Sequence, residues 1–333
     1  MDTLRTRCRG GRRSVGLLRL TVMCALVLLP SVSFAQGSEP QEVIRVDSDL
    51  VDLKVSVLRL NMPNPVGELK QNDFLVLEDG KPQEISFFAG ESEPFDLVLL
   101  LDLSGSTAKK LKLVRDSTKR FVEATRPIDR VAIVTFTDQL QLVSPLTLDR
   151  EALKKSIKKI SEPSGGSNVW DAIRSVLDAP EMNGMRRQAI VVMTDGVDNA
   201  LPGVFGEGSQ TTFAQLLERV RASDAIVFPV YLDTEKEEVK RHRSPPGAYA
   251  MARETLAQLA DISGTTVYPA KELKDLDTVY EQVIKDLGTV YSLGYKSNNG
   301  LRNGKWRSVA VQVIGRTGVS VRTKRGYYSR AEN

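Results

Sequence analysis

Cysteine and histidine are almost absent from this sequence. Among its 333 residues there are two cysteines and one histidine. Both cysteines, Cys8 and Cys24, fall within the first 35 residues, so the rest of the chain can form neither an internal disulfide bond nor a thiolate metal site. The histidine, His242, lies in a run of charged residues, where a solvated surface side chain is expected. The sequence therefore gives no support to a serine–histidine catalytic triad.

The start of the chain lacks an apolar run long enough to span a membrane. Its apolar stretch, residues 20–29, is well short of the roughly 20 residues that a spanning helix needs. An arginine-rich segment precedes this stretch, and residues 33–35 provide the small side chains that signal peptidase recognises. We expect residues 1–35 to be a secretory signal whose cleavage leaves Gln36 first, with a retained signal anchor as the alternative. The protein is then expected in the periplasm, at the cell envelope or secreted.

The folded part of the chain also lacks a basic excess. The formal net charge is +4, but the first 35 residues hold six arginines and one aspartate and account for +5. Residues 36–333 therefore carry −1, which does not favour nucleic-acid binding. Hydrophobic residues make up 41% and charged residues 26% of the chain, as in ordinary globular proteins. The length allows about two domains.

Apolar runs alternate with helical periodicity from residue 95 to residue 288. Such runs are typical of parallel strands buried on both faces, and their alternation with helices predicts a doubly wound, Rossmann-like α/β domain with a mostly parallel sheet. A further strand at 140–143 follows its predecessor after three residues, too few for a crossover helix, so we expect an antiparallel edge strand. The expected buried strands are 97–101, 131–136, 189–193, 226–231 and 265–268. The expected helices contain residues 111–121, 153–160, 173–177, 213–220 and 273–287.

Two β-rich segments flank this domain, at residues 36–94 and 289–333. The first contains an alternating strand and a hairpin, in which the turn Glu78-Asp79-Gly80-Lys81 joins a strand near 74–77 to a return strand at 83–88. Neither segment alone has enough strands to bury a stable core. We therefore expect the two segments to pack together as one small β-sandwich.

Acidic and hydroxyl side chains follow two of the predicted parallel strands. Asp102, Ser104 and Ser106 come directly after the first strand, and Asp195 ends another in a Thr-Asp-Gly turn. A Gly-Gly loop before a helix adds Ser167. Because the carboxyl ends of parallel strands meet at one edge of the sheet, the two aspartates should face each other and need a cation. Oxygen ligands of this kind suit Mg²⁺ or Mn²⁺, whereas in the alternative interpretation the aspartates merely cap helices or turns.

This combination resembles the metal-ion-dependent adhesion site of von Willebrand factor type A domains. The resemblance covers about residues 95–288, and the flanks resemble bacterial exported proteins related to this domain. It implies a non-enzymatic module that binds a partner protein, whose Asp or Glu fills the vacant coordination position of the metal. The family usually has threonine where Ser167 stands, so the hydroxyl is kept. The residues that the resemblance places around the metal, some directly and some through water, are Asp102, Ser104, Ser106, Ser167 and Asp195.

Three enzyme classes fit the same turn poorly. A dinucleotide site requires a glycine-rich turn where the carboxylate of Asp102 stands, and an aspartate-based phosphatase requires a second aspartate where Ser104 stands. Residues 106–109 match the Ser-x-x-Lys pattern of penicillin-binding enzymes, but Arg316 replaces the lysine of the third element. A structural domain whose metal only stabilises the fold stays open as the alternative function.

Two loops complete the expected site region. The loop at 196–210 contains several glycines and the aromatic Phe205, and it follows Asp195. It is expected to border the site, either as a partner-contact loop or as a surface loop without fixed structure. Residues 233–244 are rich in charge of both signs and are expected to form a solvated loop.

Overall fold

The computed structural model describes residues 50–59, 68–107, 111–162, 164–184, 186–240 and 245–331. The expected signal at 1–35, its cleavage site before Gln36, and His242 lie outside these ranges. Across the described ranges, every helix is too short or too polar to cross a membrane.

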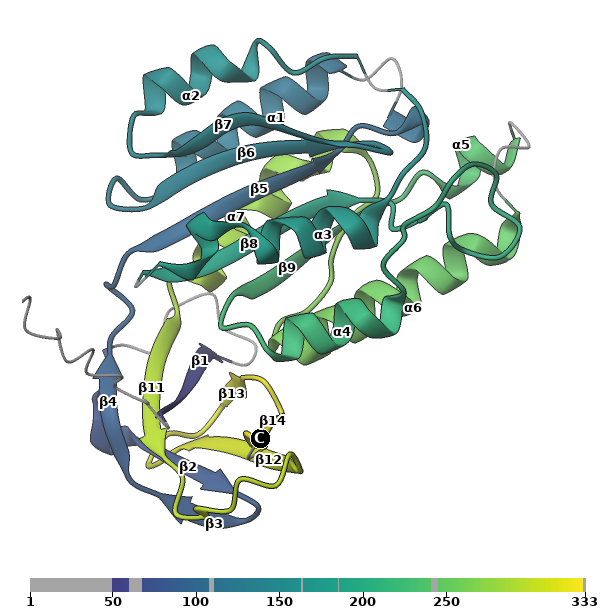
Figure 1. The fold of residues 1–333 in the computed structure, drawn as a ribbon. Coiled ribbons are helices and arrows are strands. Elements are labelled where there is room, and N and C mark those ends of the chain that lie inside the picture. The colour runs from purple at the N-terminus through teal and green to yellow at the C-terminus, as the bar shows by residue number, and fades with distance from the viewer. Residues whose placement is uncertain are drawn as a thin grey trace, which may run out of the picture. The chain divides into compact units, whose positions relative to one another are not determined.

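A six-stranded sheet forms the centre of the α/β domain (Figure 1). The strand order is β10-β9-β8-β5-β6-β7, and every neighbouring pair is parallel except β6 and β7, which are antiparallel. The predicted fold class, including the antiparallel edge strand, is therefore confirmed. Its strands are β5 (Phe95–Asp102), β6 (Arg130–Phe136), β7 (Leu140–Thr147), β8 (Arg187–Thr194), β9 (Ile226–Leu232) and β10 (Tyr268–Ala270).

Helices cover both faces of this sheet (Figure 1). Helices α1, α2 and α7 share one apolar core with the sheet, and α3, α4 and α6 share the core on the opposite face. The α-helices are α1 (Leu111–Ala124), α2 (Arg150–Ile157), α3 (Val169–Asp178), α4 (Phe213–Arg221), α5 (Glu235–Lys240), α6 (Pro246–Ser263) and α7 (Leu276–Leu287). Short 3₁₀ turns are η2 (Gly105–Thr107), η3 (Pro180–Asn183) and η4 (Leu273–Asp275).

The segment after β9 differs from the sequence prediction. It contains the short helix α5 where a solvated loop was expected, and then the 18-residue helix α6, which was not predicted. Half of the buried residues that the structure describes in α6 are alanines, namely Ala248, Ala252 and Ala260, which weaken the apolar pattern although their spacing is helical. Strand β10 also begins three residues later than the predicted strand start at Thr265.

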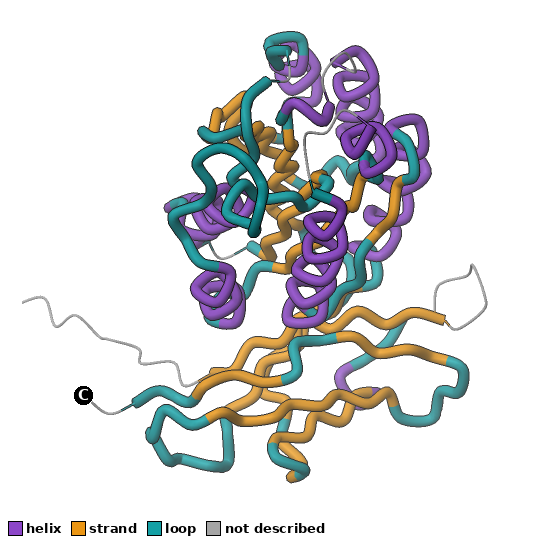
Figure 2. The backbone as a smooth tube through the Cα atoms, turned by 90° about the vertical axis from the view of Figure 1, so that its right-hand side faces the viewer, coloured by secondary structure: helices purple, strands orange, loops and turns teal. Residues whose placement is uncertain are grey.

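A second body consists of two four-stranded antiparallel sheets that share one apolar core (Figure 2). Their strand orders are β13-β1-β11-β4 and β14-β12-β2-β3, so each sheet combines strands from both flanking segments. These strands are β1 (Leu50–Arg59), β2 (Phe74–Glu78), β3 (Lys81–Gln83), β4 (Ile85–Ala89), β11 (Val290–Lys296), β12 (Trp306–Val313), β13 (Val319–Arg322) and β14 (Gly326–Tyr328), with the 3₁₀ turn η1 (Gln71–Asp73). We call this body the β-sandwich.

The predicted hairpin lies at the start of the β-sandwich. Asp79 and Gly80 join β2 to β3, and both have positive φ angles, 46° and 77°, as a two-residue type I′ turn requires. The predicted return strand at 83–88 is divided, however. Strand β3 pairs with β2, whereas β4 crosses to the other sheet and pairs with β11.

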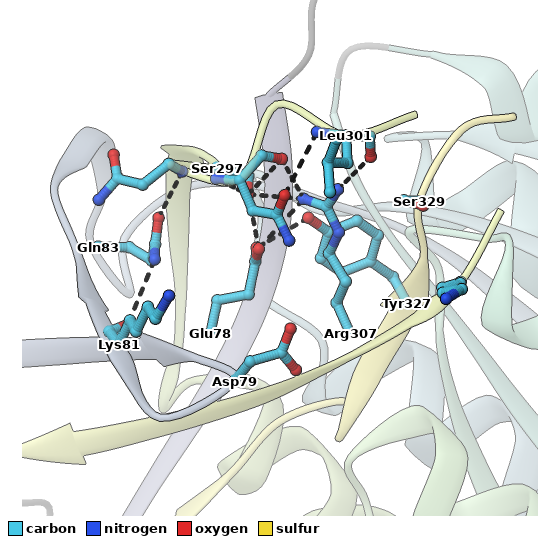
Figure 3. Close-up of polar contacts among 12 residues, drawn as sticks. Glu78, Asp79, Lys81, Gln83, Ser297, Leu301, Arg307, Tyr327 and Ser329 are labelled. Atoms are coloured by element: carbon cyan, nitrogen blue, oxygen red, sulfur yellow. Dashed lines mark hydrogen bonds and ion pairs between the residues drawn. The ribbon is translucent and has the colours of Figure 1, made fainter. Parts of the chain in front are cut away.

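A buried ion pair lies inside the β-sandwich (Figure 3). Glu78 is 2% exposed, and its carboxylate accepts hydrogen bonds from the Tyr295 and Tyr327 hydroxyls, each at 2.8 Å. It also accepts one from Ser297 Oγ at 2.6 Å and lies 3.2 Å from Arg307 Nη1. The same arginine donates further hydrogen bonds to backbone carbonyls. The carboxylate and the guanidinium are therefore both compensated without water.

The α/β domain is inserted between two neighbouring strands of the β-sandwich. The chain enters it from β4 and returns from α7 into β11, which pairs with β4. Arg187, at the start of β8, donates hydrogen bonds to the carbonyls of Glu91 and Glu93 on the incoming connection and to Val290 on the outgoing one. Burial and the nearby charge of Arg126 lower the pKa of Arg187 to about 10. One side chain thus ties both connections.

Candidate metal centre

The carboxylate of Asp102 organises the turn that follows β5. Its Oδ1 accepts a hydrogen bond from the backbone N–H of Ser104 at 2.9 Å. Its Oδ2 accepts from Ser167 Oγ at 2.9 Å and from Thr194 Oγ1 at 2.6 Å. The Ser104 and Ser106 hydroxyls lie 3.1 Å apart. The structure therefore brings three segments that are distant in sequence onto one carboxylate.

Asp195 directly follows β8, the strand next to β5, at the sheet edge where the sequence analysis expected it. Its Oδ1 accepts from the Val197 N–H at 3.1 Å, and its Oδ2 accepts from Thr234 Oγ1 at 2.7 Å. The nearby Ser106 hydroxyl favours the ionised form of this carboxylate and so acts to lower its pKa. Thr234 in turn lies 3.2 Å from the Tyr249 hydroxyl, so the second aspartate is fixed by the segment after β9 and by α6.

A hollow of about 260 Å³ opens above these side chains. Asp102 does not line it and lies behind the wall, where its carboxylate accepts a hydrogen bond from the Ser167 hydroxyl, which does line the hollow. The sequence-predicted residues that line the hollow are Ser104, Ser106, Ser167 and Asp195.

The loop that carries Ser167 is held on both sides. The Gly105 N–H donates to the Gly165 carbonyl at 3.2 Å, which joins this loop to the turn after β5. On the other side, the Asn199 side-chain oxygen accepts from the Ser167 N–H at 3.2 Å, and the Asn199 N–H donates to the Ser167 carbonyl at 2.9 Å. The hydrogen bonds from Asn199 to the Ser167 backbone therefore help to position the Ser167 hydroxyl.

Two carboxylates are buried together at this edge of the sheet. Asp102 is 1% exposed and Asp195 is 4% exposed. Burial raises the pKa of Asp102, and burial together with the negative charge of Asp102 raises the pKa of Asp195 to about 6. Each shift means that the ionised carboxylate is unfavourable in this place without a compensating positive charge.

The loop after β8 is anchored and presents one aromatic side chain. The fully buried carboxylate of Asp198 accepts hydrogen bonds from the N–H groups of Trp170, Ala200 and Ser209, and from the Ser209 hydroxyl. Between these anchors Phe205 lines the hollow and is 85% exposed. The loop borders the site, and its buried anchors give it a fixed structure.

Several residues of the site were not predicted. Thr194 and Thr234 hold the two carboxylates, Asn199 holds the loop of Ser167, and Glu238 lines the hollow from α5. Thr234 follows the end of β9 at the same sheet edge, so the rule that polar residues gather at the carboxyl ends of strands was sufficient to find it. No such signal was available for Glu238, because α5 was expected to be a loop.

A family model for the von Willebrand factor type A domain matches residues 97–197, which contain β5, the Ser167 loop and β8. The chain contains a von Willebrand factor type A domain. The resemblance stated from the sequence is therefore confirmed, and the matched residues include all five predicted site residues.

A curated relative shares part of this domain. An uncharacterized protein of Borreliella burgdorferi is 28% identical over 114 residues, which cover 32% of this chain and 33% of that protein. The chain thus spans about a third of the length of this relative.

Comparison with solved structures finds matches to part of the chain. A von Willebrand factor type A structure from Catenulispora acidiphila has a TM-score of 0.47 at 13% identity and covers 80% of this chain and 76% of that one. The von Willebrand factor domain of the type V pili tip protein Mfa5 from Porphyromonas gingivalis has a TM-score of 0.45 at 12% identity, covering 58% and 94%. Proximal thread matrix protein 1 from the mussel byssus, with a zinc-occupied MIDAS motif, has a TM-score of 0.44 at 16% identity, covering 58% and 48%.

The contact between Asn199 and the loop that carries Ser167 can be tested by a substitution at Gly166. A Cβ at position 166 would overlap the side-chain amide of Asn199, so Gly166→Ala should displace Asn199 from the Ser167 N–H. We expect Mn²⁺ affinity, measured by calorimetry, to fall roughly tenfold with little loss of fold, because only a loop outside the core moves. Gly300→Ala, where a Cβ meets open space, is the matched control. Equal affinities in both variants would contradict the role of this loop.

Proposed function

We propose that this protein binds a divalent cation, Mg²⁺ or Mn²⁺, and through it a carboxylate of a partner protein, without catalysing a reaction. The observation that carries this proposal is a hollow whose wall includes three serines and Asp195, with the carboxylate of Asp102 buried directly behind it. The proposal extends to export of the chain to the periplasm, the cell envelope or the medium.

The residues present fit a hard divalent cation. Every side chain that we assign to the centre offers oxygen, the donor that Mg²⁺ and Mn²⁺ prefer. The raised pKa values of the two aspartates support a cation at this place, because a positive charge would compensate their ionised forms. Bound there, the cation would supply an attractive charge and a coordination position for an outside ligand.

Each side chain has a distinct part in this proposal. Ser104, Ser106 and Ser167 offer hydroxyl oxygens on the wall of the hollow, and Asp195 offers a carboxylate there. Asp102 lies behind them and keeps the Ser167 hydroxyl in place while adding negative charge. Mg²⁺ usually keeps several water ligands and few protein carboxylates, which agrees with a wall of this composition.

Phe205 gives the partner a second point of contact. Its ring lies on the rim of the same hollow and is almost fully exposed, although the loop on either side is anchored. An exposed aromatic on a fixed loop loses little conformational freedom on binding. A partner that places an apolar side chain next to its Asp or Glu would bury this ring.

The proposed function predicts metal-dependent retention of a partner. Cell-envelope extract is passed over the immobilised native protein with Mg²⁺, over the native protein with EDTA, and over the immobilised Asp102→Ala variant with Mg²⁺. A partner retained only by the native protein with Mg²⁺ supports the proposal. A partner retained equally in all three cases would show that it binds elsewhere and would favour a purely structural metal.

Export predicts a defined mature chain. Amino-terminal sequencing of the native protein should begin at Gln36, because an arginine-rich start, a short apolar stretch and small residues precede it. Fractionation should find the protein outside the cytoplasm. A first residue of Met1 or Asp2 would overturn the prediction.

A further inference from the structure

A group of exposed lysines lies on two helices that cover one face of the six-stranded sheet. Helix α1 and the segment from α2 to residue 160 contain nine basic and three acidic residues, a net charge of +6, whereas residues 36–333 as a whole carry −1. Four of these lysines are exposed and form no ion pair with any residue that the structure describes: Lys112, Lys155, Lys158 and Lys159. We call these four residues the lysine patch.

The packing of α1 against α2 brings the lysine patch together (Figure 1). Both helices contribute to the same apolar core, and the Arg115 guanidinium of α1 donates a hydrogen bond to the carbonyl of Ile160, which directly follows Lys159. Lys112 lies three residues before Arg115 and therefore on the same face of α1. The first turns of α1 thus lie beside the end of α2.

Other basic side chains of these helices are already paired within the domain. Arg120 lies 2.6 Å from the carboxylate of Asp277. Lys154 pairs with Glu123 at 3.2 Å and with Glu151 at 3.0 Å. The positive charge that remains for an outside ligand therefore belongs largely to the lysine patch. Its ammonium groups are point charges on flexible stems, which suit a series of separate carboxylates better than one fixed planar ligand.

The lysine patch borders the candidate metal centre. Six residues separate Ser106 from Lys112, so their Cα atoms lie at most about 22 Å apart, and five residues separate Lys159 from Ser164, which sets a limit of about 18 Å. The Ser164 N–H donates to the Leu103 carbonyl at 2.8 Å, so the loop that leaves the patch lies against the turn after β5. A chain bound at the metal centre can therefore reach these lysines with about seven extended residues.

Negative charges within the same surface favour a protein ligand over a lipid surface. Asp116 lies one helical turn after Lys112, and Glu162 follows Lys159 by three residues. A bilayer of anionic lipids would repel both carboxylates. A protein segment can instead place its own carboxylates opposite the lysines and away from these two positions. Charge complementarity therefore points to an acidic stretch of protein chain.

We propose that the lysine patch binds an acidic segment of the partner protein whose Asp or Glu reaches the metal. The inference rests on the proposed function for the contact at the metal, and it adds a property of the partner. Further Asp or Glu residues lie within about seven positions of the carboxylate that binds the metal. These charges speed association and select this partner among other proteins that present a carboxylate.

The test uses two synthetic peptides of equal length in place of the partner. Both contain one aspartate in a glycine–serine chain, and the acidic peptide has four glutamates about seven positions away from it. Calorimetry in the presence of Mn²⁺ should give the acidic peptide a roughly tenfold higher affinity for the native protein at low ionic strength. Salt at about 0.5 M should remove most of this preference.

Glutamine variants locate the source of the preference. The patch variant combines Lys112→Gln, Lys155→Gln, Lys158→Gln and Lys159→Gln, and it should bind both peptides equally. Glutamine has nearly the helix propensity of lysine, so α1 and α2 should keep their structure, which circular dichroism checks. The matched control makes the same change in net charge at four exposed lysines outside the α/β domain and should keep the native preference. It combines Lys70→Gln, Lys81→Gln, Lys296→Gln and Lys305→Gln.

The outcomes separate the inference from the function beneath it. A patch variant that still prefers the acidic peptide as strongly as the control does would overturn the inference, and loss of both peptides on adding EDTA would still support the metal function. If EDTA changes neither affinity but the patch variant loses the preference, the metal function is wrong and the patch remains a surface for acidic ligands. Vesicles of phosphatidylglycerol and phosphatidylcholine test the other occupant. If they bind through the patch while the native protein does not distinguish the peptides, the surface recognises lipid and the inference is wrong.

Discussion

Asp102→Ala is expected to lower Mn²⁺ affinity by at least about a hundredfold. The substitution removes one of the two buried negative charges and leaves the Ser167 hydroxyl without the acceptor that holds it at 2.9 Å. The fold should persist, because Asp102 is the last residue of β5 and its side chain is not part of the apolar core on either face of the sheet. Three donors lose an acceptor, which costs a few kcal/mol at most.

Calorimetric titration of Mn²⁺ measures this effect directly, and circular dichroism checks the fold. Asp138→Ala is a suitable control, because Asp138 is an exposed carboxylate in the neighbouring turn whose side chain contacts Thr137 and not the hollow. We expect native affinity in this control. Equal Mn²⁺ affinity in Asp102→Ala and the wild type would refute the metal assignment.

Arg307→Met should destabilise the protein by about 3–5 kcal/mol. The variant leaves Glu78 fully buried with no cation beside it, in a place where water cannot compensate its charge. Most of this loss comes from the uncompensated carboxylate and not from the missing arginine contacts. A second substitution, Glu78→Gln, should therefore recover part of the stability, since the amide oxygen still accepts from Tyr295 or Tyr327.

Urea unfolding followed by circular dichroism gives the free energies of unfolding of the wild type, of Arg307→Met and of the double variant. Arg316→Met serves as the control, because it removes an exposed arginine from the same half of the chain. We expect a change within about 0.5 kcal/mol there. A double variant no more stable than Arg307→Met would show that the charge of Glu78 is not the source of the loss.

The parallel strands could be predicted because their physical signal is strong. Residues 97–101 and 189–193 are short, continuous apolar runs. Such runs are typical of strands that are buried on both faces of a parallel sheet. Helix α6 could not be predicted in the same way. Three of its buried residues are alanines, at positions 248, 252 and 260, and alanine contributes little apolar contrast to the sequence.

The site could be predicted as far as its residues lie in one local motif or at the ends of recognised strands. Asp102 and Asp195 met this condition, and the structure brings their supporting hydroxyls together. The sequence could not predict how deeply each side chain is buried. It assigned Asp102 and Ser104 alike to the lining of the metal site, whereas the Asp102 carboxylate lies behind the wall of the hollow. Glu238 depended on a helix that the charge pattern of residues 233–244 concealed.

The insertion of the α/β domain between β4 and β11 also has a mechanical consequence. A force applied to the α/β domain would reach the β-sandwich through two covalent connections at once, because the domain is entered and left through the neighbouring strands β4 and β11. Arg187 donates hydrogen bonds to both connections, so we expect neither to extend under force before the other. The tension is thus divided between β4 and β11, two strands of one sheet, and is not carried by a single linker.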